Sequence, residues 1–202
     1  MDGEVMSAPR VDYFYSFRSP YSYLSGPRGF ALADDFEIEL HFRGVIPMMM
    51  RGESVPTAKR LHTMRDVKRE ADRLGMPFGR IHDPLGDGAT RCLAVSEYAI
   101  EQGRARDFVL AAGMGIWGEA TDPATDHGLR RICDAAGLDW DGCKAALSNQ
   151  AIADRVEANT NELVGIGHWG VPVFVYEGEQ FWGQDRIDDL TLVLSDAGLG
   201  RR

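Results

Sequence analysis

The chain has 202 residues, of which 44% are hydrophobic and 26% charged, and this composition is typical of one globular domain or one domain with a large insertion. Thirty-one acidic residues against 22 basic ones give a formal net charge of −9. Nucleic acids and anionic membrane surfaces both require a cationic face, so we expect neither as a partner.

We expect neither a signal peptide nor a membrane-spanning segment. Residues 1–10 (MDGEVMSAPR) are acidic and carry no hydrophobic stretch, so we expect no signal peptide. No apolar run approaches the roughly 20 residues that a membrane-spanning helix needs. We therefore expect a cytoplasmic protein whose three cysteines, Cys92, Cys133 and Cys143, are buried free thiols.

The first forty residues predict a strand, a helix and a second strand. Residues 11–17 (VDYFYSF) are rich in aromatic and β-branched side chains, as a buried strand is. Ser19 and Pro20 form a helix start signal, and the helix is expected to run to about residue 33. Residues 36–42 (FEIELHF) alternate apolar and polar residues, which predicts a half-buried strand. A helix between two strands favours a parallel pair.

The middle of the chain is predicted to be helical. Between residues 47 and 150 strand signals are missing, and glycine and proline separate the helical stretches. The clearest helices are residues 89–102, 105–117 and 126–136. Strand signals then return: we expect a helix over 151–164, a strand over 171–176, a turn over 177–179, a returning strand over 180–182, and a helix over 185–196.

This order predicts an α/β fold, a thioredoxin-like domain with a large all-helical insertion. Residues 10–46 and 151–202 would form the discontinuous thioredoxin-like domain, and residues 47–150 the insertion. A match to the dinucleotide-binding pattern at residues 113–118 (GMGIWG) is set aside, because a helix rather than a strand precedes it. The five histidines are scattered, so we expect no metal site.

Ser19 to Ser22 (SPYS) lies where redox proteins of the thioredoxin fold carry two cysteines. Both cysteine positions are serine here, so the protein supplies no sulfur at this helix start. The helix N-terminus and the Ser19 hydroxyl could still stabilise a thiolate that a ligand brings. The alternative is that Ser19 only caps the helix.

Two later segments could complete such a site. A cis bond between Val171 and Pro172 would expose the backbone of Val171 to an extended peptide, whereas an ordinary trans proline would only begin the strand. Gln184 and Asp185 could present polar side chains to a zwitterion, although Asp185 could equally be a helix cap.

Together these segments resemble a known family. Residues 19–24 (SPYSYL), 116–119 (IWGE), 169–172 (WGVP) and 181–186 (FWGQDR) are similar, in order and spacing, to the 2-hydroxychromene-2-carboxylate isomerases and the related kappa-class glutathione transferases. The resemblance covers nearly the whole chain from Val11. It implies a DsbA-like fold of the thioredoxin superfamily, a homodimer, and glutathione bound between the two parts of the fold.

The resemblance also implies roles for individual residues. Ser19 would activate the glutathione sulfur. Val171, before Pro172, would pair with the tripeptide backbone, and the γ-glutamyl end would be received by Trp182, Gly183, Gln184 and Asp185. The isomerase would convert 2-hydroxychromene-2-carboxylate, or a related intermediate of aromatic catabolism, to trans-o-hydroxybenzylidenepyruvate through a transient glutathione adduct.

The chain departs from the family pattern in the region that would meet the substrate. Residues 48–56 (MMMRGESVP) align poorly with the family's segment, so its substrate-contacting asparagine is not assigned to any residue of this chain. Tyr21, Arg91 and Trp117 are weaker candidates for substrate contact. Two alternatives stay open: a kappa-class-like transferase that keeps the conjugate, and a non-catalytic thioredoxin-like binding module.

Overall fold

A computed structural model describes residues 8–54 and 56–201 of the chain. Most of the segment that we expected not to be a signal peptide lies outside these residues, as does Arg202. Within the described residues no helix is both long enough and apolar enough to cross a membrane.

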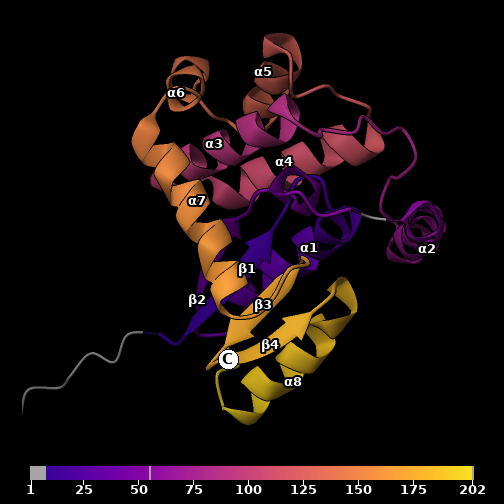
Figure 1. The fold of residues 1–202 in the computed structure, drawn as a ribbon. Helices are drawn as coiled ribbons and strands as arrows, with labels where there is room; N and C mark the ends of the chain where they lie inside the picture. The colour runs from indigo at the N-terminus through magenta and orange to yellow at the C-terminus, as the bar shows by residue number, and fades with distance from the viewer. Residues whose placement is uncertain (1–7, 55, 202) are drawn as a thin grey trace, which may run out of the picture.

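The structure has one mixed sheet of four strands, ordered β2-β1-β3-β4 (Figure 1). Strands β1 (Arg10–Tyr15) and β2 (Glu39–Gly44) are parallel, while β3 (Val173–Tyr176) and β4 (Glu179–Trp182) form an antiparallel hairpin, with β3 also antiparallel to β1. Helix α1 (Pro20–Asp35) connects β1 to β2. The predicted βαβ unit, its parallel pair and the later hairpin are therefore confirmed.

The second strand begins later than predicted. Residues 36–42 were expected to form it, but helix α1 continues to Asp35 and the N–H of Phe36 bonds to the carbonyl of Leu32 as the helix ends. Phe36 then forms an isolated bridge with Gly200. The alternating pattern was correct for residues 39–42, and the helix end displaced only the boundary.

The two faces of β1 explain how the sheet is covered. Tyr13 is buried against helix α1 and stacks on Phe174 of β3, with ring centroids 4.3 Å apart. Phe14 points to the opposite face and packs with Leu163 of α7 (Gln150–Gly165). This alternation follows from the pleat of a strand, so residues of one short aromatic run serve both layers.

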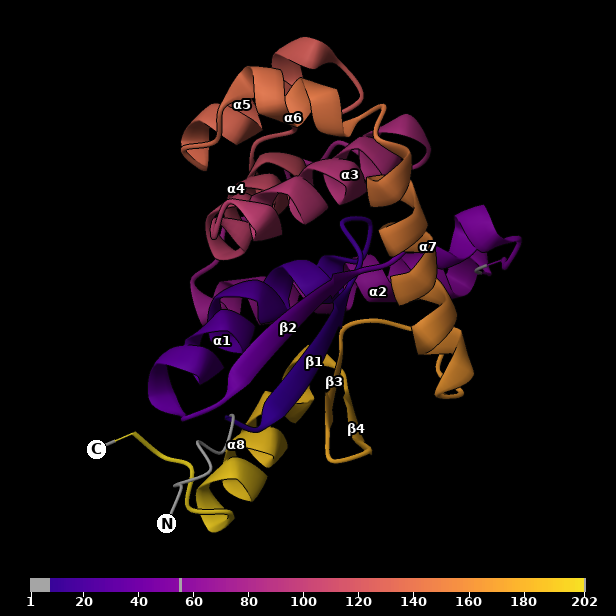
Figure 2. The same ribbon diagram turned by 90° about the vertical axis from the view of Figure 1, so that its left-hand side faces the viewer.

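Four of the helices between β2 and α7 form a separate layer above the sheet (Figure 2). They are α3 (Asp87–Glu101), α4 (Ala105–Gly118), α5 (Asp126–Ala135) and α6 (Trp140–Ala146), and α4 packs on α1. The three predicted helices agree with α3, α4 and α5 to within one or two residues. The match to the dinucleotide-binding pattern lies inside α4, so no strand leads into it.

Helix α2 (Thr57–Leu74), which follows a short 3-10 turn, η1 (Met48–Arg51), lies apart from the other inserted helices in Figure 1. It buries only Val67 and Ala71. The chain returns through β4, a second 3-10 turn, η2 (Gln184–Arg186), and α8 (Ile187–Asp196). The fold is the expected thioredoxin-like α/β fold with a helical insertion.

Candidate active site

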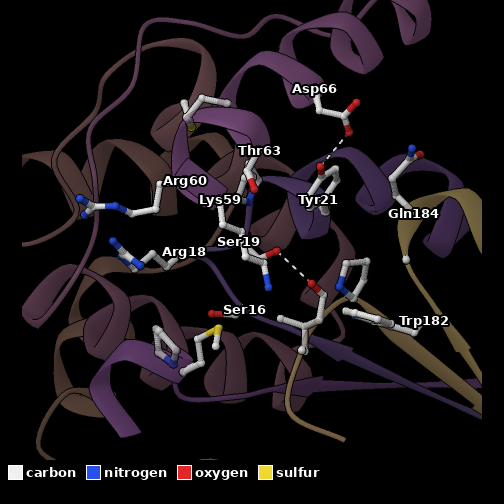
Figure 3. Close-up of a pocket in the computed structure, with 18 of the residues that line it drawn as sticks. Ser16, Arg18, Ser19, Tyr21, Lys59, Arg60, Thr63, Asp66, Trp182 and Gln184 are labelled. Carbon is white, nitrogen blue, oxygen red and sulfur yellow. Dashed lines mark hydrogen bonds between the residues drawn. The ribbon is translucent and has the colours of Figure 1, made fainter. Parts of the chain in front are cut away.

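Ser19 begins helix α1 and connects it to a loop far along the chain. Its backbone is extended at φ −92° and ψ 116°, and its hydroxyl oxygen accepts a hydrogen bond from the N–H of Ser22 at 3.2 Å, as an N-cap does. The same hydroxyl donates to the carbonyl oxygen of Val171 at 3.1 Å (Figure 3). Ser19 is therefore both a helix cap and a side chain that reaches the predicted peptide-binding loop.

In the loop before β3 the bond between Val171 and Pro172 is cis, which decides between the two alternatives left open by the sequence. The Pro172 carbonyl accepts a hydrogen bond from the N–H of Gly183 at 3.0 Å, which fixes this loop to the end of β4. Gly183 has φ +119°, and a β-carbon there would lie 2.4 Å from a carboxylate oxygen of Asp185. Glycine is favoured at this position because side chains rarely adopt this backbone conformation, whereas the Asp185 carboxylate could move aside.

Gln184 is buried at the start of η2, with only 4% of its surface exposed. Its Nε2 donates to a carboxylate oxygen of Glu70 at 3.0 Å. The side-chain oxygen of Gln184, Oε1, is also buried, and it has no hydrogen-bond partner among the described residues. An unpaired buried acceptor costs free energy, so a ligand that donates to Oε1 would bind more favourably here.

A cavity of about 1170 Å³ brings these segments together. It lies between the thioredoxin-like part and helix α2, and it is larger than the pocket of most single small ligands. Nine of the ten residues selected from the sequence line it: Ser19, Tyr21, Trp117, Val171, Pro172, Trp182, Gly183, Gln184 and Asp185.

Arg91, the tenth candidate, is not brought to the cavity. It lies on α3, where its Nε donates to the carbonyl of Pro123 at 3.1 Å and its guanidinium pairs with Asp126. This ion pair lowers the pKa of Asp126 below its usual value. The structure therefore places Arg91 in a contact between α3 and the start of α5, away from the other candidates.

Tyr21 joins helix α1 to helix α2. Its hydroxyl donates to a carboxylate oxygen of Asp66 at 2.7 Å (Figure 3). Burial, with the neighbouring Asp66 carboxylate, raises the pKa of Tyr21, so the side chain stays a phenol at neutral pH. Trp117 is 5% exposed and stacks on Phe78, and its indole N–H is buried with no partner in the described part of the chain.

The charged wall on helix α2 was missed by the sequence analysis. Five residues of one helix face line the cavity at spacings of three and four: Lys59, Thr63, Asp66, Glu70 and Arg73. The sequence signal for this helix is the pair Val67 and Ala71, two apolar residues four positions apart in a segment rich in charged residues. This spacing predicts an amphipathic helix with a narrow apolar face.

An aromatic cluster contributes Trp169 and Trp182 to the lining of the cavity. Trp169 is 42% exposed and Trp182 is 48% exposed, and their ring centroids are 5.2 Å apart. The ring centroid of His168 lies 5.1 Å from that of Trp182. The Lys59 ammonium lies 5.0 Å from the centre of the Trp169 ring, a cation–π contact. Large flat faces and a cation at one opening suit an anionic organic ligand.

Free thiols are found only away from the cavity lining, in the part of the chain that the structure describes. Cys92, Cys133 and Cys143 are all buried and unpaired, as predicted. Burial raises the pKa of Cys92, which makes it unreactive. Among residues 8–54 and 56–201, no group of three acidic, histidine or cysteine side chains is placed to hold a metal ion.

Comparison with known proteins finds relatives that align over most of the chain. The chain is 29% identical to 2-hydroxychromene-2-carboxylate isomerase from Sphingobium xenophagum, over 92% of this chain and 98% of that protein. The isomerase of the same name from Pseudomonas putida is 24% identical, over 88% of this chain and 90% of that protein.

Solved structures show the same fold. A structure of 2-hydroxychromene-2-carboxylate isomerase matches with a TM-score of 0.79 and 23% identity, covering 93% of this chain and 95% of that one. The cytosolic disulfide reductase DsbM from Pseudomonas aeruginosa, solved with GSH, matches with a TM-score of 0.68 and 16% identity. The match covers 92% of this chain and 99% of that one.

The family model of the DSBA-like thioredoxin domain matches residues 10–195, nearly the whole chain. This match includes the four strands of the sheet, the helix capped by Ser19 and the cis-proline loop. The chain therefore belongs to the DSBA-like thioredoxin domain family.

Proposed function

We propose that the protein is a glutathione-dependent isomerase that acts on 2-hydroxychromene-2-carboxylate or a related intermediate of aromatic catabolism. The relatives of that name align over almost their entire length. The observation that carries the proposal is the hydrogen bond from Ser19 to Val171, in a cavity whose lining contains no cysteine. A site of this fold without its own thiol suits a ligand that brings one.

The cavity residues fit glutathione, which has an ammonium group, two carboxylates, two amides and a thiol. The Oε1 of Gln184, which has no partner among the described residues, can accept a hydrogen bond from the ammonium, and the carboxylate of Glu70, paired with Arg73, lies beside it. Lys59 has no carboxylate within ion-pair distance among the described residues, so it is free to bind a ligand carboxylate. The backbone of Val171 can pair with a peptide.

Ser19 stabilises negative charge at the helix start. Its hydroxyl carries one proton, which now serves the Val171 carbonyl, and a sulfur anion is a stronger acceptor than that carbonyl. When the hydroxyl turns to the sulfur, a peptide N–H can replace it at Val171. A charged hydrogen bond of about 1.5–3 kcal/mol would lower a thiol pKa by roughly one to two units, toward neutrality.

Glutathione, when bound, supplies a thiolate that forms a carbon–sulfur bond with the electrophile and, in an isomerisation, breaks it again, so no electrons are gained or lost. The protein's part is to keep the thiol ionised at Ser19 and to hold the electrophile beside it. Trp117 contributes a flat apolar wall and an indole N–H that has no partner among the described residues, which suits an aromatic substrate with a hydrogen-bond acceptor.

Product analysis tests the reaction type. The protein, glutathione and 2-hydroxychromene-2-carboxylate are mixed, and free glutathione and the trans product are quantified by chromatography. We expect full recovery of glutathione with formation of trans-o-hydroxybenzylidenepyruvate. A stable thioether would instead support a kappa-class-like transferase, and neither product would support a non-catalytic binding module. We also propose a cytoplasmic homodimer, which light scattering during size-exclusion chromatography would test for its oligomeric state.

A further inference from the structure

The cavity has two chemically different ends on either side of Ser19. In Figure 3 Trp182 and Gln184 lie on one side of Ser19, and Arg18 and Arg60 lie on the other. The Gln184 end carries carboxylates, of which Glu70 is paired with Arg73 and Asp185 with Arg186, and an acceptor, Gln184 Oε1, that has no partner among the described residues. We assign this end above to the ammonium group of glutathione. The Arg18 end is therefore the place for the second reactant.

Arg18 directly precedes the serine and is held in a defined position. Its Nε and Nη2 donate to the two carboxylate oxygens of Asp83, each at 2.8 Å, and Nη1 lies 2.9 Å from the sulfur of Met49. A thioether is a weak acceptor, so a stronger one would displace it. The edge of the guanidinium formed by Nη1 and Nη2 is thus available to bind a carboxylate with two hydrogen bonds.

The charge at this end is positive. Asp83 pairs with Arg18, but the Asp83 side chain is 56% exposed, so solvent weakens its effect on the charge of Arg18. Arg60 also lines the cavity and has no carboxylate within 4.0 Å in the part of the chain that the structure describes. An incoming anion therefore meets one free guanidinium and one whose second edge is open.

The surroundings suit an aromatic body attached to that anion. Ile81 lies in the same cavity wall, and the N–H of His82 bonds to the carbonyl of Ile116 at 3.0 Å, which places this wall against Trp117. The hydroxyl of Ser16 and the indole N–H of Trp117 are both buried and lack partners among the described residues. Two unused donors and apolar walls favour a flat ligand with acceptor oxygens.

We propose that Arg18 determines the selectivity of this site for electrophiles that carry a carboxylate, with Asp83 as the residue that positions it. This inference rests on the proposed function, because it assumes that the Gln184 end holds glutathione. Since Arg18 and Ser19 are adjacent in the chain, a carboxylate held by Arg18 would keep the rest of the substrate close to the sulfur held by Ser19.

The test compares two unreactive probes of equal shape, trans-cinnamate and its neutral amide cinnamamide. Their dissociation constants are measured by isothermal titration calorimetry without glutathione, for the wild type and for Arg18→Gln. We expect Arg18→Gln to weaken cinnamate binding by about tenfold or more, the worth of a charged hydrogen bond, and to leave cinnamamide unchanged. An unchanged ratio of the two constants would overturn the proposal.

Arg91→Gln is the matched control, because Arg91 also pairs with an aspartate but lies outside the cavity lining. It should leave both constants unchanged, and loss of the preference in this variant would contradict the assignment to Arg18. If Arg18→Gln does not fold, Asp83→Asn replaces it. Asparagine keeps one oxygen that accepts a hydrogen bond from Arg18 but removes the counter-charge, so this variant should strengthen cinnamate binding relative to cinnamamide. An unchanged or weaker preference for cinnamate would overturn the proposal.

A second readout separates this inference from the proposed function. Ionisation of bound glutathione is followed in Arg18→Gln by the ultraviolet absorbance of the thiolate. A normal thiolate signal with an unchanged preference for cinnamate would reject the role of Arg18 and leave the glutathione site standing. Absence of the signal in the wild type would reject the glutathione site itself.

Discussion

The hydroxyl of Ser19 donates a hydrogen bond to the carbonyl oxygen of Val171 at 3.1 Å, across 152 positions of the chain. One residue begins helix α1 and the other precedes the cis-proline loop, so the fold brings an alcohol and a strand-end backbone to one point. A serine proton can serve only one acceptor well, and the choice between the Val171 carbonyl and a ligand sulfur is the basis of the proposed mechanism.

Replacement of Gln184 by leucine should separate binding from stability. The change removes an acceptor that is buried and unpaired in the described structure, but it also removes the bond to Glu70. Because these effects oppose each other, the free energy of unfolding should fall by no more than about 1 kcal/mol, while KM for glutathione should rise about tenfold. Chemical denaturation and steady-state kinetics measure the two quantities.

Gln180→Leu is the control for this variant. Like Gln184, Gln180 donates a hydrogen bond through its Nε2. The acceptor is the backbone carbonyl of Ile166 at 2.8 Å, and Gln180 does not line the cavity. Its KM for glutathione should equal that of the wild type. If Gln184→Leu also leaves KM unchanged, the ammonium end of glutathione does not lie at Gln184.

Loss of the Tyr21 hydroxyl should loosen helix α2. Tyr21→Phe removes the bond to Asp66, and α2 has only two buried residues to hold it in place. We expect faster amide hydrogen exchange in α2 and kcat/KM lowered by about tenfold, because this helix forms one wall of the cavity. Asp66→Asn keeps an acceptor and should give smaller changes. Wild-type exchange rates in Tyr21→Phe would show that another contact positions the helix.

His168 should make stability depend on pH. Desolvation lowers its pKa, and its Nδ1 accepts the N–H of Gly170 at 3.2 Å, just before the cis-proline loop. A histidine whose pKa is lowered on folding contributes stability above the pKa of the unfolded chain, and this contribution is lost as the pH falls through the folded pKa.

Denaturation at pH 7 and pH 5 tests this expectation. His168→Asn retains an oxygen that can accept the Gly170 N–H but does not titrate in this range. The wild type should therefore lose more unfolding free energy than the variant between the two pH values. Equal losses would mean that His168 has the same pKa in the folded and unfolded chain.

Local patterns were enough to predict most of the fold. Ser19 and Pro20 marked a helix start because a side-chain cap and a fixed φ act within a few residues. The start of the second strand was predicted too early. Nothing in residues 36–38 shows that Phe36 caps helix α1 and pairs with Gly200, which lies far along the chain. Such boundaries depend on tertiary contacts that a local pattern does not contain.

The site was predicted unevenly for the same reason. Ser19, Val171 and Gln184 lie in segments whose resemblance to a family is strong, and the structure brings them to one cavity. Arg91 matched only by its approximate position, and its partner Asp126 can be identified only from the folded structure. Arg18 carries no signal of its own, because an arginine beside a helix start is usually a surface residue.

The thiolate absorbance of bound glutathione, measured against pH in the wild type and Ser19→Ala, tests the central claim most directly. Thr125→Ala is the matched control: it removes another hydroxyl N-cap, that of α5, and should cost about 1 kcal/mol of stability without affecting the thiol. We predict that the wild type and Thr125→Ala ionise glutathione near neutral pH, whereas Ser19→Ala requires a pH higher by about one unit. Identical titration curves for the wild type and Ser19→Ala would contradict the account.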